Sequence, residues 1–165
     1  MNNDQPVSSP NEKLILVDQN DRPLGQITKR DAHDGDGRLH RAFSIFLFND
    51  RKQLLLQKRS QNKPLWPGFW ANSCCSHPRV GEELEEAVHR RLKQELNVST
   101  VVHYLYKFEY KASFKDVGTE HELCSVWLGH VREEDIEFNR EEISEIKYVP
   151  IEKMEKELAR NSDIY

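Results

Sequence analysis

One long amphipathic helix, set in a chain of strand-like segments, is the feature that most limits the possible folds. Acidic residues fill the first turn of residues 82–96, as expected near a helix N-terminus. Apolar residues then recur at four-residue intervals, at Leu84, Val88, Leu92 and Leu96. Asn97 follows where a left-handed helix cap is expected. A helix with one apolar face requires a sheet or another helix to cover that face.

Strand-like segments occupy most of the remaining chain. The first and third of them are each followed by a short turn and a second apolar run, so we expect two hairpins. Thr28 is expected to cap a short helix, and residues 151–159 to form another. Mixed strands around one long helix predict an α+β fold, or a three-layer α/β/α arrangement. Apolar runs bounded by turn formers predict the strands at 13–17, 22–27, 42–48, 53–58, 101–111, 119–131 and 143–149.

The chain length of 165 residues suits a single domain with a single core. Residues 1–12 are rich in Asn, Ser and Pro and are expected to form a flexible tail. Residues 13–165 are expected to form the domain. No apolar run approaches the roughly 18 residues of a membrane-spanning helix, so we expect no membrane contact.

Charge and cysteine content narrow the class of partner and the compartment. Twenty-four basic and 28 acidic residues give a net charge of −4, which provides no general basic field for nucleic acid. The three cysteines are an odd number, and no secretory signal precedes them. We therefore expect a cytoplasmic protein that does not bind nucleic acid and that is a monomer or weak dimer.

Histidines and cysteines give two candidate clusters. His33 and His40 flank a Gly-Asp loop, where two imidazoles can converge, although capping or surface histidines have the same spacing. In the segment Asn72-Ser73-Cys74-Cys75-Ser76-His77-Pro78, strand alternation places Cys75 and His77 on one face and turns Cys74 away. A free cysteine is commonly only a small buried hydrophobic residue, which fits Cys74.

Carboxylates give two more clusters. Alternation along 120–124 places Glu120, Glu122 and Cys124 on one face, where two buried carboxylates need a cation or a proton. The alternative is an exposed face on which both are solvated. Arg91 and Glu95 lie four residues apart on the long helix, a spacing that also produces ordinary surface salt bridges.

The clusters become informative together. If their strands are neighbours, they supply three imidazole nitrogens and two carboxylates, a donor set that suits Mn²⁺, Mg²⁺ or Zn²⁺. Cys75 is not needed as a ligand and stays available for chemistry. The expected metal ligands are His33, His40, His77, Glu120 and Glu122.

At this point the sequence resembles the type 1 isopentenyl-diphosphate isomerases, which have a Nudix-like fold. The resemblance covers about residues 14–148. It rests on four pieces in order: His33 to His40 with Arg38-Leu39-His40-Arg41-Ala42-Phe43, then Trp66-Pro67-Gly68, the segment 72–78, and Glu120-His121-Glu122-Leu123-Cys124.

The resemblance implies a role for each matching residue. The five expected ligands bind one divalent metal, and Cys75 and Glu122 transfer protons, with Tyr110 supporting Glu122. We expect Glu122 to be the acid and Cys75 the opposing group, with roles that exchange when the reaction reverses. Glu95 helps to hold a Mg²⁺ that accompanies the allylic or homoallylic diphosphate substrate. The residues expected to contact the diphosphate oxygens are Lys29, Arg59, Lys63 and Arg91.

The long helix matches a degenerate Nudix box. Two of the three carboxylates of its core are replaced, by Arg91 and Gln94, and Glu95 is kept. A hydrolase needs those carboxylates to gather metals and activate water, so the replacements argue against diphosphate cleavage. A Nudix-type diphosphate hydrolase and a silent metal- or diphosphate-binding module remain the alternatives.

The family commonly continues into a C-terminal segment with a tryptophan that faces the hydrocarbon end of the substrate. The present sequence ends at Tyr165. We expect a trimmed chain, a short natural version, or replacement of that residue by Trp70 or Trp127.

Overall fold

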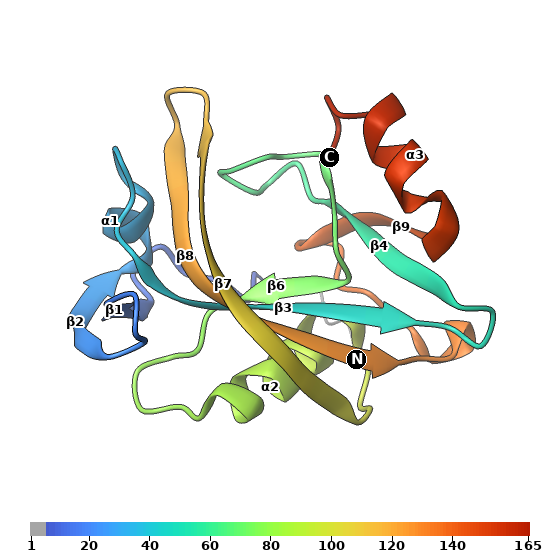
Figure 1. Cartoon of the computed structure of the whole chain (residues 1–165), viewed down its shortest axis with the longest axis horizontal. Helices are drawn as coiled ribbons and strands as arrows, with labels where there is room; N and C mark the ends of the chain where they lie inside the picture. Colours follow the sequence, from blue (N-terminus) through green and yellow to red (C-terminus); the bar gives the residue numbers. More distant parts are fainter. Residues whose placement is uncertain (1–5) are drawn as a thin grey trace.

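Strands from both ends of the chain join one mixed sheet (Figure 1). The computed structural model describes residues 6–165, which contain nine strands and three α-helices. The elements are β1 (Lys13–Val17), β2 (Pro23–Thr28), α1 (Lys29–His33), β3 (His40–Phe48), β4 (Gln53–Arg59), β5 (Trp70–Ala71), β6 (Cys74–Ser76), α2 (Leu84–Leu96), β7 (Val102–Phe114), β8 (Gly118–His130), β9 (Ile143–Pro150) and α3 (Met154–Arg160). Short 3₁₀ turns occupy Glu133–Asp135 and Ile151–Lys153.

The first hairpin and its capped helix confirm the sequence prediction. β1 and β2 pair antiparallel, and α1 begins directly after β2. The Thr28 side-chain oxygen accepts a hydrogen bond from the Asp31 backbone N at 3.2 Å, which satisfies one free N–H of the first helical turn. This cap fixes the start of α1 and with it the position of His33 at the end of the helix.

The second expected hairpin is wrong in its pairing. β3 and β4 form one antiparallel pair of residues, Phe48 opposite Leu54, and then separate. The segment before β6 enters the gap: the Ser73 hydroxyl accepts from Leu47 N at 2.8 Å and donates to Leu55 O at 2.7 Å. β6 then pairs with β3, while β4 pairs along its length with β9. A local turn signal predicts the reversal of the chain, but it does not predict which strand completes the sheet.

The long hairpin of β7 and β8 carries much of the polar centre. β8 also runs parallel to β3, in a register that places His40 opposite Glu122. The hairpin reaches α1 at Gly118, where a Cβ atom would lie 2.7 Å from the His33 carbonyl oxygen. Only a glycine allows the beginning of β8 to approach the end of α1 so closely.

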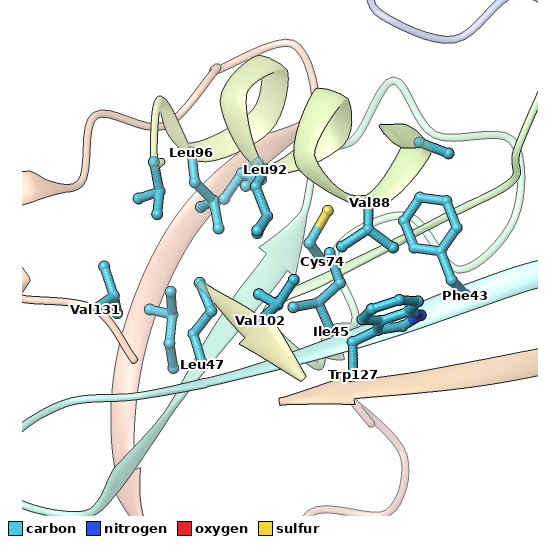
Figure 2. Packing of buried hydrophobic residues seen from close by; sticks show 14 residues of the cluster. Phe43, Ile45, Leu47, Cys74, Val88, Leu92, Leu96, Val102, Trp127 and Val131 are labelled. Carbon is cyan, nitrogen blue, oxygen red and sulfur yellow. The ribbon is translucent and has the colours of Figure 1, made fainter. Parts of the chain in front are cut away.

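The main apolar core lies between α2 and one face of the sheet (Figure 2). Alternate residues of β3 point toward the helix and are fully buried. The predicted apolar stripe of α2 meets them, and Asn97 adopts the expected left-handed conformation at φ 55°. The side chains that fill this layer include Phe43, Ile45, Leu47, Cys74, Val88, Leu92, Leu96 and Trp127.

Part of the opposite face is covered near the C-terminal end of the described chain. Met154 of α3 packs on a second cluster that contains Leu54 and Leu56 of β4. Figure 1 shows α2 and α3 on opposite sides of the sheet, which confirms the predicted α+β, three-layer arrangement. Within residues 6–165, no helix combines the length and apolar character that a membrane crossing requires.

Candidate active site

Three imidazoles and one carboxylate converge from four separate elements. His33 ends α1, His40 begins β3, His77 follows β6, and Glu122 lies on β8. One ligand atom of each of these four residues lies within 4.8 Å of the others. The ring centroids of His33 and His40 are 4.9 Å apart, as are those of His40 and His77. Strand register and the cap of α1 therefore bring together residues that are up to about ninety positions apart in the sequence.

Backbone carbonyls orient two of the rings. His33 Nδ1 donates to Lys29 O, and His40 Nδ1 donates to Arg38 O, each at 2.6 Å. In a neutral ring this leaves Nε2 as the atom with a free lone pair. Within the described residues, the buried His40 Nε2 and His77 Nδ1 have no hydrogen-bond partner. Buried polar atoms are rarely left unpaired, so the donor set fits a divalent metal ion.

Burial sets the protonation of this group. It lowers the pKa of His33 to about 4 and that of His77 to about 3, so both rings are neutral at neutral pH, as metal ligands must be. Burial alone would raise the pKa of Glu122. The hydrogen bond from His77, together with the His40 ring whose Nε2 lies 3.7 Å from Glu122 Oε1, outweighs burial and holds the pKa of that carboxyl well below its usual range. His77 Nε2 lies 3.0 Å from Glu122 Oε1.

Glu120, the fifth expected ligand, lies outside the group of four. Its carboxylate accepts a hydrogen bond from the Tyr110 hydroxyl at 3.0 Å, and the same hydroxyl lies 2.7 Å from Glu122 Oε2. Tyr110 is directly opposite Glu122 in the β7–β8 hairpin. Burial, together with the neighbouring charge of Glu122, raises the pKa of Glu120 to about 7. The two carboxylates thus differ in acidity although they are two residues apart.

Cys75 lies on the same face of the sheet as Glu122. Antiparallel pairing of β6 with β3 places Cys75 opposite Ser44, whose hydroxyl is 3.7 Å from the sulfur. The Cys75 thiol donates to Asn72 Oδ1 at 2.6 Å. Burial raises the pKa of Cys75 to about 12, so its sulfur carries a proton. Cys74, its neighbour in sequence, points into the α2 core as predicted.

Three of the expected diphosphate contacts form a cluster of cations. Lys63 and Arg91 both form ion pairs with Glu142, which is 3% exposed. Burial, together with the neighbouring charges of Lys63 and Arg91, lowers the pKa of Lys29 to about 8. A lysine destabilised by its cationic neighbours is suited to contact a polyanion.

Arg59 and Glu95 are the remaining residues expected to act on the diphosphate or its Mg²⁺. The Arg59 guanidinium at the end of β4 donates twice to Leu65 O, and its charge also acts on Cys75 and Glu120. The guanidinium therefore lies close to the groups around the thiol. Glu95 is buried on α2 and forms an ion pair with Arg91.

The N-terminal segment contacts the cationic cluster. Val7 N donates to Glu142 Oε1 at 2.8 Å, and the Ser8 hydroxyl accepts from Lys29 Nζ at 3.2 Å and from Arg91 at 3.5 Å. The described part of the expected flexible tail thus makes specific hydrogen bonds from Val7 onward. Residues 1–5 of that tail lie outside the described residues.

Several residues at the site had no role in the sequence analysis. Asn72 and Ser44 contact Cys75, and Glu142 joins two cations, but single polar residues carry no periodic or charge signal that marks such contacts. Trp127, considered above as a replacement for a C-terminal tryptophan, packs in the α2 core at 7% exposure and so faces away from Cys75. Trp70 is buried with Leu54 and Leu56 in the second cluster.

The fold and the sequence both match known proteins. Residues 38–165 match the NUDIX domain family. DR0079 of Deinococcus radiodurans, a solved structure, shares 28% identity and superposes with a TM-score of 0.75, covering 91% of this chain and 90% of that one. The architecture is therefore that of a Nudix-domain protein, with a polar centre built on its sheet.

Curated relatives define the family more closely. "Isopentenyl-diphosphate Delta-isomerase 1" of Photorhabdus laumondii subsp. laumondii is 50% identical over 119 residues, which are 71% of this chain and 68% of that protein. "Isopentenyl-diphosphate Delta-isomerase 2" of the same organism is 42% identical over 154 residues, 93% of this chain and 86% of that protein. The chain belongs to the isopentenyl-diphosphate Delta-isomerase family.

Proposed function

We propose that this protein interconverts isopentenyl diphosphate and dimethylallyl diphosphate. The observation that carries the proposal is the placement of the Cys75 thiol and the Glu122 carboxylate on one face of the sheet, beside a donor group that fits a divalent metal. The reaction adds a proton to the terminal alkene carbon and removes one from the carbon next to the diphosphate-bearing carbon. Two proton carriers that act at opposite ends of an allyl unit match this need.

Cys75 and Glu122 are the two carriers, and Tyr110 supports Glu122 through the hydrogen bond described above. Since the reaction is reversible, each group gives its proton in one direction and takes it in the other. His33, His40, His77 and Glu122 would hold Mn²⁺, Mg²⁺ or Zn²⁺, with Glu120 beside them. A bound ion there would supply positive charge that fixes the Glu122 carboxylate and sets its acidity.

The cationic cluster provides the contacts for the diphosphate. The Ser8 hydroxyl accepts from Lys29 and Arg91, and the Glu142 carboxylate pairs with Lys63 and Arg91. The diphosphate would bind among these three cations. Arg59 would contact the oxygens nearest to the reacting carbons. Glu95 would help to hold a Mg²⁺ that accompanies the diphosphate. Concentrated local charge explains how a protein with a net charge of −4 binds an anion.

The reaction passes through a tertiary carbocation, which water would trap. The pocket must therefore exclude water and offer aromatic faces that stabilise positive charge. Tyr110 continues into a row of rings along β7, with ring centroids 5.7 Å apart between Phe108 and Tyr110 and 6.1 Å apart between Tyr106 and Phe108. This row lies on the face that carries Glu122.

Diphosphate hydrolysis is the alternative chemistry of the fold. In that case α2 would present several carboxylates for metal ions. Here Arg91 occupies one of those positions and forms ion pairs with Glu95 and Glu142. A buried cation at this position opposes the binding of several metal ions along α2, so the geometry argues against hydrolysis.

Proton NMR of isopentenyl diphosphate in heavy water with Mg²⁺ tests the proposal. The expected result is the appearance of dimethylallyl diphosphate with deuterium in its new methyl group, without release of phosphate. Release of phosphate would instead show a hydrolase. Binding without conversion would show a silent binding module.

A further inference from the structure

The side-chain amide of Asn72 is fixed from two sides. Its Nδ2 atom donates to Ile45 O on β3 and to Cys74 O on β6, each at 3.1 Å. Two carbonyl acceptors determine which end of the amide carries the nitrogen. The oxygen must then point the other way, toward Cys75.

The sulfur of Cys75 lies between this oxygen and a hydroxyl. Asn72 Oδ1 is 2.6 Å from Cys75 Sγ, and Ser44 Oγ is 3.7 Å from it. The Cys124 thiol donates to the same Ser44 hydroxyl at 3.3 Å, which leaves the Ser44 hydrogen free to point at Cys75. The four groups form one directed chain of hydrogen bonds, from Cys124 through Ser44 and Cys75 to Asn72.

We propose that Asn72 is a positioning residue for the Cys75 thiol in the isomerisation, with Ser44 as the second contact of the sulfur. The proposal rests on the proposed function, because it gives the reason for holding this sulfur in one orientation. An amide oxygen accepts a hydrogen bond without bringing a charge, so it fixes the position of the sulfur and adds no negative charge beside the groups that bind the diphosphate.

Orientation matters in this reaction because the partner of the thiol is a carbon atom. An alkene carbon or a C–H bond offers no strong hydrogen bond that could align a freely rotating thiol. The protein must therefore hold the sulfur in place, and misplacement of a reacting group by about 1 Å can cost on the order of 10²-fold in rate. The network that fixes Asn72 includes the backbone of β3 and β6, so it is rigid before any substrate binds.

Steady-state kinetics of an Asn72→Ala variant test the role. We expect kcat to fall on the order of tenfold to a hundredfold, the effect of one lost hydrogen bond in the transition state, while KM for isopentenyl diphosphate stays within about twofold. Asn72→Asp is expected to lose a similar factor, because a carboxylate cannot donate to Ile45 O and Cys74 O. Asn20→Ala, an exposed change in the β1–β2 turn, is the matched control and should leave both constants unchanged. An unchanged kcat in Asn72→Ala, or a rise in KM alone, would overturn the proposal.

An infrared measurement keeps the proposal testable if Asn72→Ala does not fold. The difference spectrum between the unmodified protein and Cys75→Ala isolates the S–H stretching band of Cys75. A thiol that donates to an amide oxygen should absorb at a lower frequency than an alkane thiol in hydrocarbon solvent. A band at the frequency of the free thiol would contradict the contact. This result does not depend on turnover, so failure of the isomerase assignment and failure of the Asn72 assignment are distinguishable.

Discussion

The two faces of the central sheet use the same backbone for different purposes. On the face toward α2, β3 and β6 contribute Phe43, Ile45 and Cys74 to a dry apolar layer. On the opposite face the alternate positions are occupied by His40, Ser44 and Cys75. Because strand alternation separates the two sets, each face is arranged without disturbing the other.

The adjacent residues Cys74 and Cys75 show the same contrast between the apolar and the polar face of the sheet. Burial raises the pKa of both thiols, so acidity does not distinguish them. The difference lies in their neighbours: Cys74 is fully buried in the α2 core, near Arg91 and Glu95, whereas Cys75 is half-buried and hydrogen-bonded to Asn72. A reactive position in this fold is thus defined by access and orientation.

The largest expected effect separates these two cysteines. Replacement Cys75→Ala removes one proton carrier, and we expect turnover of isopentenyl diphosphate to fall on the order of 10³-fold or more. Cys74→Ala removes only a small buried group. It should lower the free energy of unfolding by about 1 kcal/mol and leave kcat within about twofold.

Turnover by NMR and urea unfolding of both variants check this pair. Calorimetric binding of a diphosphate analogue should remain nearly normal in Cys75→Ala, which shows that the site is intact. Near-normal turnover in Cys75→Ala, or equal losses of turnover in both variants, would remove the functional distinction between the two faces.

The donor group predicts a second, smaller effect on the polar face. In His33→Asn, the new amide can still donate to Lys29 O, but the atom equivalent to Nε2 is gone. We expect the affinity for Mn²⁺ to fall on the order of a hundredfold, because one of four ligands is lost. Isothermal titration calorimetry measures this, and His103→Asn on exposed β7 is the matched control. Equal Mn²⁺ affinity in the two variants would show that His33 is not a ligand.

Most of the fold could be predicted from local patterns. The apolar stripe of α2, the Thr28 cap, the left-handed Asn97 and the long β7–β8 hairpin all depend on residues close in sequence. The pairing of β3 was not predictable in this way. Its partners β6 and β8 are far away in the chain, and β6 takes the place beside β3 that the turn signal assigned to β4.

The candidate site shows the same division. Residue type and spacing make the histidines and Glu122 candidates, because few side chains bind metals. Glu120 has the same chemistry as Glu122, but its place beside Tyr110 depends on strand register. Asn72, Ser44 and Glu142 act through single contacts with distant residues, and such contacts have no sequence period from which they could be predicted.

The smallest expected effect concerns Glu142, the carboxylate that pairs with Lys63 and Arg91 of the cationic cluster. Burial by itself would raise the pKa of Glu142. The charges of Lys63 and Arg91 together outweigh burial, and the pKa of Glu142 falls from the ordinary 4.5 to about 2. A depressed pKa in the folded state adds stability that is complete above pH 4.5 and is lost as the pH falls toward 2. Glu142→Gln keeps the shape of the side chain and removes this charge. We expect it to lower the free energy of unfolding by about 1–2 kcal/mol at pH 7, and by progressively less below pH 4.5.

Urea unfolding of both proteins between pH 7 and pH 3 measures the difference, and Glu145→Gln, at an exposed position of β9, is the control. If the difference in the free energy of unfolding stays constant with pH, Glu142 stabilises the cationic cluster by packing and not by charge. A difference that narrows with falling pH would show that the cationic cluster needs a resident anion when no diphosphate is bound. In that case the Glu142 carboxylate stabilises the cationic cluster beside α2 by charge, whereas the apolar layer of α2 is stabilised by burial, so the two regions differ in the force that holds them.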